Sequence, residues 1–117
     1  MILHRLFRSI GVVVSRSGWD SKASFLEFKA GKTTANHSHL DINSFVFYAY
    51  GRRLIKNLGS WPYTLNGGLG FFDTKGRRWC YEANSTLGHN ILLVDRRGQN
   101  YGDNCYGAIV RAEFSDK

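Results

Sequence analysis

Cysteine and proline are scarce in this sequence, and long apolar runs are missing. Cys80 and Cys105 are the only cysteines. They are too few and too far apart for a cysteine-based zinc motif, and they allow at most one disulfide. Pro62 is the only proline, and no linker, internal repeat or low-complexity tract divides the chain. No apolar run approaches the roughly 20 residues of a membrane-spanning helix, so we expect one domain over residues 1–117 and no membrane insertion.

The amino-terminal segment lacks the marks of a secretory leader. Met1 to Val14 has a basic opening and an apolar stretch, but Arg5 and Arg8 interrupt that stretch. No small-residue cleavage site follows it. No signal peptide is predicted in this chain.

Acidic residues are outnumbered by basic ones. Nine Asp and Glu stand against 16 Lys and Arg, which gives a formal net charge of +7. Such a surface attracts polyanions, and the charge alone does not separate acidic polysaccharide from nucleic acid. Hydrophobic residues make up 43% and aromatic residues 15% of the chain, which is typical of a packed domain and not of a disordered tail.

Helical spacing of apolar residues is also hard to find. Short alternating or β-branched runs, bounded by Gly, Asn, Asp and Ser, recur along the whole chain. The predicted strands cover residues 11–16, 24–30, 43–50, 52–57, 70–74, 90–95 and 106–114. Turn signals with glycine lie between them. The pattern predicts an all-β fold, an antiparallel β-sandwich.

The stretch from Asn36 to Phe47 leads into the strand with the clearest alternation. If it is extended from its start, His37, His39, Asp41 and Asn43 share one face. Neighbours on one face stand about 7 Å apart, so imidazoles and a carboxylate would form a cluster of proton carriers or metal ligands. A solvent-facing strand edge with incidental histidines is the alternative, because the motif is short.

A second stretch, residues 84–95, places His89 at the start of an apolar run. A metal held by imidazoles usually takes its ligands from more than one element, so a pairing of His39 with His89 is geometrically reasonable. Taken by itself, a histidine in this position is more often a turn residue than a ligand.

Together the two stretches resemble the heparinase II/III-like polysaccharide lyases. In that family one β-domain strand opens with His-x-His-x-Asp, and a later one opens with His-Asn ahead of apolar residues and Val-Asp. Further similar stretches are residues 16–20, 25–31, 47–52 and 59–63, and the resemblance spans residues 6–100. It implies a larger enzyme in which an N-terminal α/α toroid and a C-terminal β-sandwich close over an acidic polysaccharide. Only the second part is expected in this chain.

The resemblance also implies a divalent metal, commonly zinc, with His39, Asn57 and His89 at the matching positions. The family usually has an acidic residue where Asn57 stands. An amide oxygen still coordinates but carries no negative charge, so weaker or altered metal binding is expected. Asp41 and Asn43 are expected to hold the imidazoles in orientation.

For catalysis, His37 matches the family histidine of the cleft, and the resemblance implies that it neutralises the uronate carboxylate or assists proton movement. β-Elimination removes the C5 proton of a uronate and expels O4, so it needs a base and a proton donor. Tyr63 and Tyr81 are the candidates for these roles, although aromatic residues of a β-sandwich are more often core or rim. Arg52 and Arg78 are the candidates for substrate binding, because arginine forms paired hydrogen bonds with carboxylate and sulfate.

Two other functions remain open. Uronate C5-epimerases of the dermatan sulfate type resemble the chain around the same His-x-His-x-Asp stretch and start from the same proton abstraction, but they leave the polymer length unchanged. A noncatalytic β-domain that binds polyanions is the other alternative. Its nucleic-acid form is not expected, since the aromatic residues follow strand patterns and no single-strand-binding signature is present.

The family's toroid supplies part of the catalytic machinery. The isolated chain is therefore expected to be inactive, and elimination of heparan sulfate or alginate by the chain alone would contradict this. The periplasm or cell envelope is the location that the resemblance implies for bacterial members.

Overall fold

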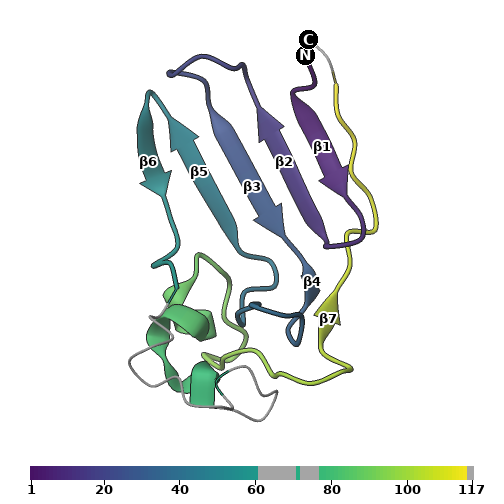
Figure 1. Ribbon diagram of the computed structural model, residues 1–117, viewed down its shortest axis with the longest axis vertical. Helices are drawn as coiled ribbons and strands as arrows, with labels where there is room; N and C mark the ends of the chain where they lie inside the picture. The colour runs from purple at the N-terminus through teal and green to yellow at the C-terminus, as the bar shows by residue number, and fades with distance from the viewer. Residues whose placement is uncertain (61–70, 72–76, 116–117) are drawn as a thin grey trace.

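The computed structural model describes residues 1–60, 71 and 77–115. Its main element is an antiparallel sheet with the strand order β1-β2-β3-β5-β6 (Figure 1). These strands are β1 (His4–Phe7), β2 (Val12–Arg16), β3 (Phe25–Lys29), β5 (Phe45–Ala49) and β6 (Arg52–Ile55). A second, two-stranded sheet pairs β4 (Gly31–Lys32) with β7 (Tyr106–Gly107).

Three short 3-10 helices gather below one end of the five-stranded sheet (Figure 1). They are η1 (Arg77–Cys80), η2 (Glu82–Asn84) and η3 (Thr86–Gly88). The described ranges contain no α-helix, and no helix in them is long and apolar enough to cross a membrane. The predicted all-β antiparallel fold is therefore confirmed, with the five-stranded sheet as a layer consistent with a β-sandwich domain.

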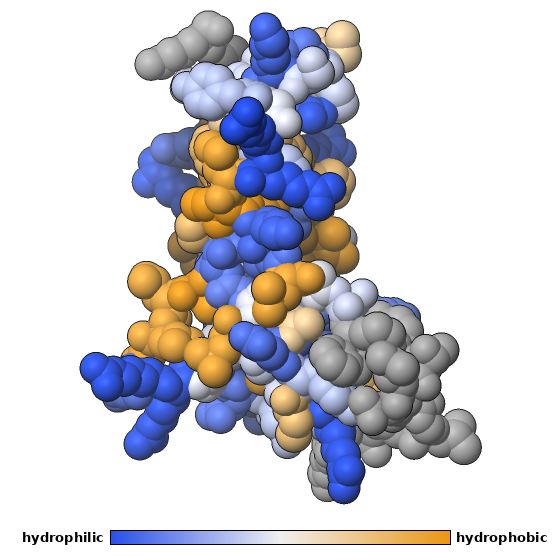
Figure 2. Space-filling view, turned by 90° about the vertical axis from the view of Figure 1, so that its left-hand side faces the viewer, coloured by the Kyte–Doolittle hydropathy of each residue, from blue (hydrophilic) through white to orange (hydrophobic). Residues whose placement is uncertain are grey.

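The two faces of this sheet differ because side chains alternate along each strand. One face is apolar: Val13 stands opposite Phe28, and Phe28 stands opposite Phe45. This face stays partly open, since Leu26 is 40% exposed and Phe45 is 36% exposed. Figure 2, which views the molecule from the β6 edge, shows apolar side chains reaching the surface over the body of the sheet and again lower down.

The buried apolar side chains are few among the described residues. They are Ala30, Leu40, Ala49, Phe71 and Trp79. Leu40 and Trp79 belong to the segments at the helical end of the sheet, so part of the core lies where the loops meet and not between the strands.

Several strand predictions need correction. The short strands β1 and β4 were missed. Residues 90–95 were predicted as a strand but are irregular, because Asp95 and Arg96 have φ of 51° and 56° and Val94 makes only an isolated bridge. Residues 106–114 contain only β7 among the described elements. The predicted strand at 70–74 lies outside the described residues except for Phe71.

Candidate metal centre

The polar row predicted on one strand face is not a strand face. His37 has φ of 57° and Asn43 has φ of 69°, and β5 begins only at Phe45. Left-handed backbone at two positions interrupts the extended conformation, so the simple alternation of side chains is lost. The prediction that His37, His39, Asp41 and Asn43 share one face is therefore wrong.

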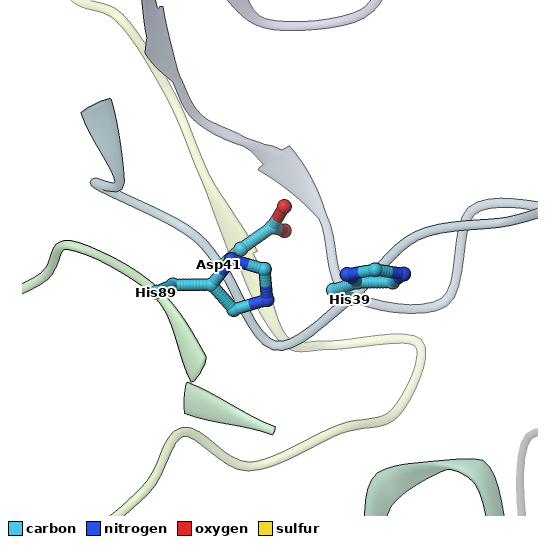
Figure 3. Close-up of side chains that lie close together, drawn as sticks. All are labelled: His39, Asp41 and His89. Carbon is cyan, nitrogen blue, oxygen red and sulfur yellow. The ribbon is translucent and has the colours of Figure 1, made fainter. Parts of the chain in front are cut away.

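Three side chains from these stretches nevertheless meet. His39 and Asp41 lie in the loop before β5, and His89 follows η3 directly (Figure 3). Each offers one potential ligand atom, and these atoms all lie within 4.8 Å of one another. The centroids of the two imidazole rings are 5.2 Å apart. We call these three residues the metal group.

Burial favours the form of histidine that binds metals. Desolvation lowers the pKa of His39 and of His89, while the charge of Asp41 acts in the opposite direction and the charge of Lys29 adds to the lowering. Neutral imidazole is the form that coordinates a cation. Burial therefore favours the imidazole form that coordinates a cation, whereas the positive charge of Lys29 opposes an incoming cation.

The hydrogen bonding of His89 also fits a metal ligand. In the described part of the chain, neither of its ring nitrogens has a hydrogen-bond partner, although both are buried. The Ala83 backbone lies near enough to oppose the pKa shift but not in hydrogen-bonding geometry. A buried polar atom without a partner costs about 1–3 kcal/mol. Two imidazoles and a carboxylate suit zinc, so these residues fit the metal that the resemblance implied.

Asp41 is held by Lys29, the last residue of β3. The lysine Nζ donates to both carboxylate oxygens at 2.7 Å, and Asp41 is buried. A carboxylate has about four acceptor positions, so this pairing leaves some of them available. The lysine charge, however, offsets that of Asp41. The sequence indicated Asp41 both as a member of a cluster with the imidazoles and as a support for them, and it did not indicate Lys29.

Gln99 ties the two ligand-bearing segments together. Its side-chain oxygen accepts the Ile42 backbone N–H at 3.0 Å, and its amide nitrogen donates to the Ile42 carbonyl at 2.6 Å. Its own backbone N–H donates to Oγ1 of Thr86 at 2.8 Å. Ile42 adjoins Asp41, and Thr86 precedes His89 by one 3-10 turn. Nothing in the sequence marked Gln99, because its partner Ile42 lies 57 positions away.

The other predicted ligand and support lie beside this arrangement. Asn57 Oδ1 accepts hydrogen bonds from the backbone and side-chain amides of Asn90, at 3.4 and 3.2 Å. It thereby anchors the residue next to His89. Asn43 lines an apolar groove with Phe28 and Phe45, and its backbone N–H donates to the Lys29 carbonyl at 2.8 Å.

The predicted catalytic residues are not members of the metal group. His37 is exposed and lines a separate pocket of about 550 Å³ that also includes Lys32 and Tyr106. Tyr81 is half-buried and stacks on Phe71, with ring centroids 6.0 Å apart. Tyr63 lies outside the described residues.

The two arginines predicted to bind substrate have different settings. Arg52 is exposed at the start of β6 and lines an open pocket at the end of the sheet. Arg78 is only 2% exposed, and its guanidinium carbon lies 4.0 Å from the Trp79 ring centroid. Its charge is one of the influences that lower the pKa of His39. Arg52 is therefore accessible to a polymer in this arrangement, whereas Arg78 is covered.

The chain matches a known protein family over most of its length. The heparinase II/III-like C-terminal family matches residues 3–112, a range that includes both ligand-bearing segments. No curated protein sequence gives a significant match. The chain belongs to the heparinase II/III-like C-terminal domain family, whose context is polysaccharide cleavage by lyases.

Proposed function

We propose that this chain is the β-domain of an enzyme that cleaves uronate-containing acidic polysaccharides, of the heparin, heparan sulfate or alginate kind, by β-elimination. One observation carries the proposal: His39, Asp41 and His89 converge from two distant segments of a lyase-family domain. The net charge of +7 supports an acidic polymer as the partner.

The reaction sets clear demands on side chains. A base takes the C5 proton, the C–H electron pair forms the C4–C5 double bond, the C4–O4 bond breaks, and O4 takes a proton. The carboxylate at C5 must lose charge for that proton to become acidic. We assign His37 to neutralising the carboxylate or moving a proton, and Tyr63 and Tyr81 to the base and acid roles. The exposure of His37 beside Lys32 supports its part in this assignment.

We further propose that His39, Asp41 and His89 hold a divalent ion, with zinc as the best match to the donor set. A bound ion of this kind supplies Lewis acidity. Asn57 contributes by fixing Asn90 and, through it, the backbone beside His89.

The chain is proposed to work together with an α/α toroid domain, in the periplasm or cell envelope. The partly open apolar face of the five-stranded sheet supports a role as part of a larger assembly. Product analysis of that assembly separates two reactions: a lyase leaves unsaturated uronate ends, whereas an epimerase leaves chain length unchanged.

The metal content of the chain tests the convergence of His39, Asp41 and His89, and this test does not require the toroid domain. The purified chain is stripped with a chelator, reloaded with zinc, and analysed by mass spectrometry and calorimetry. We expect near-stoichiometric zinc in the wild type, and more than about a tenfold loss of affinity in His39→Ala and His89→Ala. The matched control is His37→Ala, which removes an exposed imidazole and should keep the metal. Absence of bound zinc in the wild type would contradict the assignment. Retention of zinc by Asn57→Ala would show that Asn57 anchors Asn90 and does not coordinate the ion.

A further inference from the structure

The polar face of the five-stranded sheet carries a row of aromatic and guanidinium side chains at the end away from the 3-10 helices. Arg16, Phe25 and Tyr48 stand directly opposite one another across β2, β3 and β5, and Arg53 of β6 stands opposite Tyr48. The Arg16 guanidinium carbon is 5.5 Å from the Phe25 ring centroid. The Phe25 and Tyr48 centroids are 5.8 Å apart, and the Arg53 guanidinium carbon is 5.6 Å from that of Tyr48.

Trp19 completes the row at the turn that follows β2. Its ring centroid lies 4.0 Å from the Arg16 guanidinium carbon, yet the side chain is 56% exposed. Stacking of this kind holds the plane of a guanidinium and leaves its N–H donors at the edges. Trp19 therefore offers an open indole surface beside an oriented cation.

An open pocket of about 360 Å³ lies against this row. Arg16, Phe25, Tyr48 and Arg52 line it from the strands, and Asp20 lines it from the turn after β2. This combination of apolar rings with a few polar groups is typical of small-ligand sites.

The positive charges at this pocket are not taken up by ion pairs within the described residues. Among the described residues the ion pairs are Lys29–Asp41 and Arg111–Glu113, so neither Arg16 nor Arg52 has one. The Arg16 Nε is buried without a hydrogen-bond partner. Asp20, the acidic residue of the lining, accepts the Lys22 backbone N–H through Oδ1. Guanidinium groups in this state favour an incoming carboxylate or sulfate.

The pocket and the metal group lie along the same face of β3. Phe25 and Lys29 are four positions apart and so point to the same side, and Lys29 holds Asp41. At a strand rise of about 3.3 Å per residue, the two ends are about 13 Å apart. Glu27 lies between them as an acidic side chain. An extended polymer laid along β3 therefore reaches both places.

We propose that Trp19, Arg16 and Arg52 form a distal subsite for an anionic sugar residue of the polysaccharide. The apolar C–H face of the sugar ring packs on Trp19, and its carboxylate or sulfate binds the arginines. This subsite rests on the proposed function, because it binds the same polymer a few sugar residues away from the metal group.

Calorimetry with oligosaccharides of defined length tests the subsite. The zinc-supplied chain is titrated with an alginate-derived hexauronate, the corresponding dimer, a heparin-derived hexasaccharide and neutral cellohexaose. We expect the acidic hexamers to bind more tightly than the dimer, and cellohexaose to bind weakly. Trp19→Ala and Arg52→Gln should each weaken hexamer binding by about tenfold, the equivalent of about 1.4 kcal/mol. Binding of the dimer should not depend on Trp19.

Arg97→Gln is the matched control, because it removes one exposed positive charge outside the pocket. Equal weakening by Arg97→Gln and Arg52→Gln would show diffuse attraction and overturn the subsite. Unchanged hexamer binding in Trp19→Ala and Arg52→Gln would also overturn it while leaving the proposed function intact. Failure of the wild type to bind any acidic oligosaccharide would count against the proposed function itself. Unfolding midpoints by circular dichroism verify that the variants fold, as the exposure of Trp19 leads us to expect.

Discussion

Lys29 controls the charge of the metal group. With neutral imidazoles on His39 and His89, Asp41 supplies the negative charge, and Lys29 offsets it at 2.7 Å. An incoming divalent cation therefore competes with the lysine for the same carboxylate. This competition is a property of one side chain, and a single substitution removes it.

We expect Lys29→Met to destabilise the metal-free chain and to strengthen zinc binding. Loss of the ammonium leaves a buried carboxylate without this partner, at a cost of about 1–3 kcal/mol. Zinc then restores the missing positive charge, so the zinc-induced rise in Tm should exceed that of the wild type. Thermal unfolding with and without zinc measures both effects. Lys32→Met, at an exposed lysine, serves as the control. An equal or smaller zinc effect in Lys29→Met would mean that the lysine does not compete.

At the scale of elements, the 3-10 helix η3 positions His89 in the metal group. Gly88 ends this 3-10 helix, and a Cβ added there would lie 2.1 Å from the Glu82 carbonyl oxygen. The helical turns are thus packed too closely for any larger residue at this position. A change of one methyl group must therefore move η2, η3 or both.

Gly88→Ala is expected to cost about 1–3 kcal/mol of unfolding free energy, as overpacking usually does. Because His89 follows directly, zinc affinity should also fall by more than about tenfold. Denaturant unfolding and zinc calorimetry measure the two quantities. Gly98→Ala provides the control, since its Cβ would meet Thr86 at an ordinary 3.5 Å. Full zinc affinity in a folded Gly88→Ala variant would refute the coupling of η3 to the site.

At the scale of the whole molecule, apolar surface remains uncovered. Leu26 and Phe45 share in the open face of the sheet, and Leu92 in the segment after His89 is 90% exposed. Exposed patches of this kind mark contact surfaces or aggregation sites. The five-stranded sheet therefore provides one side of a core that is incomplete in the described residues.

The folded chain is expected to bind an apolar dye such as anilinonaphthalene sulfonate. A double variant, Leu26→Thr with Phe45→Thr, should lower the fluorescence of the bound dye several-fold. Its unfolding free energy should fall by about 2–4 kcal/mol, because Leu26 and Phe45 are each more than half buried. Val110→Thr alters an exposed residue of the carboxyl-terminal segment and is the control. No dye binding by the folded wild type would show that the face is covered in solution.

The local patterns of the sequence were sufficient for the regular strands. Alternation over residues 11–16 and 24–30 predicted β2 and β3 closely, because the two-residue period of a strand is written in consecutive residues. The same local patterns marked His39 and His89. They failed for the supposed row from His37 to Asn43, where left-handed backbone at both ends breaks the period.

The sequence by itself determined the antiparallel β class, the basic surface and the two histidines that carry the family resemblance. The tertiary structure decided which side chains stand beside them. Asp41 lies with both histidines although the predicted strand face is absent, Lys29 offsets its charge, Gln99 ties the segments together, and Trp19 stacks on Arg16. Metal-group assembly in particular depends on contacts between residues far apart in the chain. Contacts of this kind produce no repeating pattern in consecutive residues. Only the folded backbone brings such residues together.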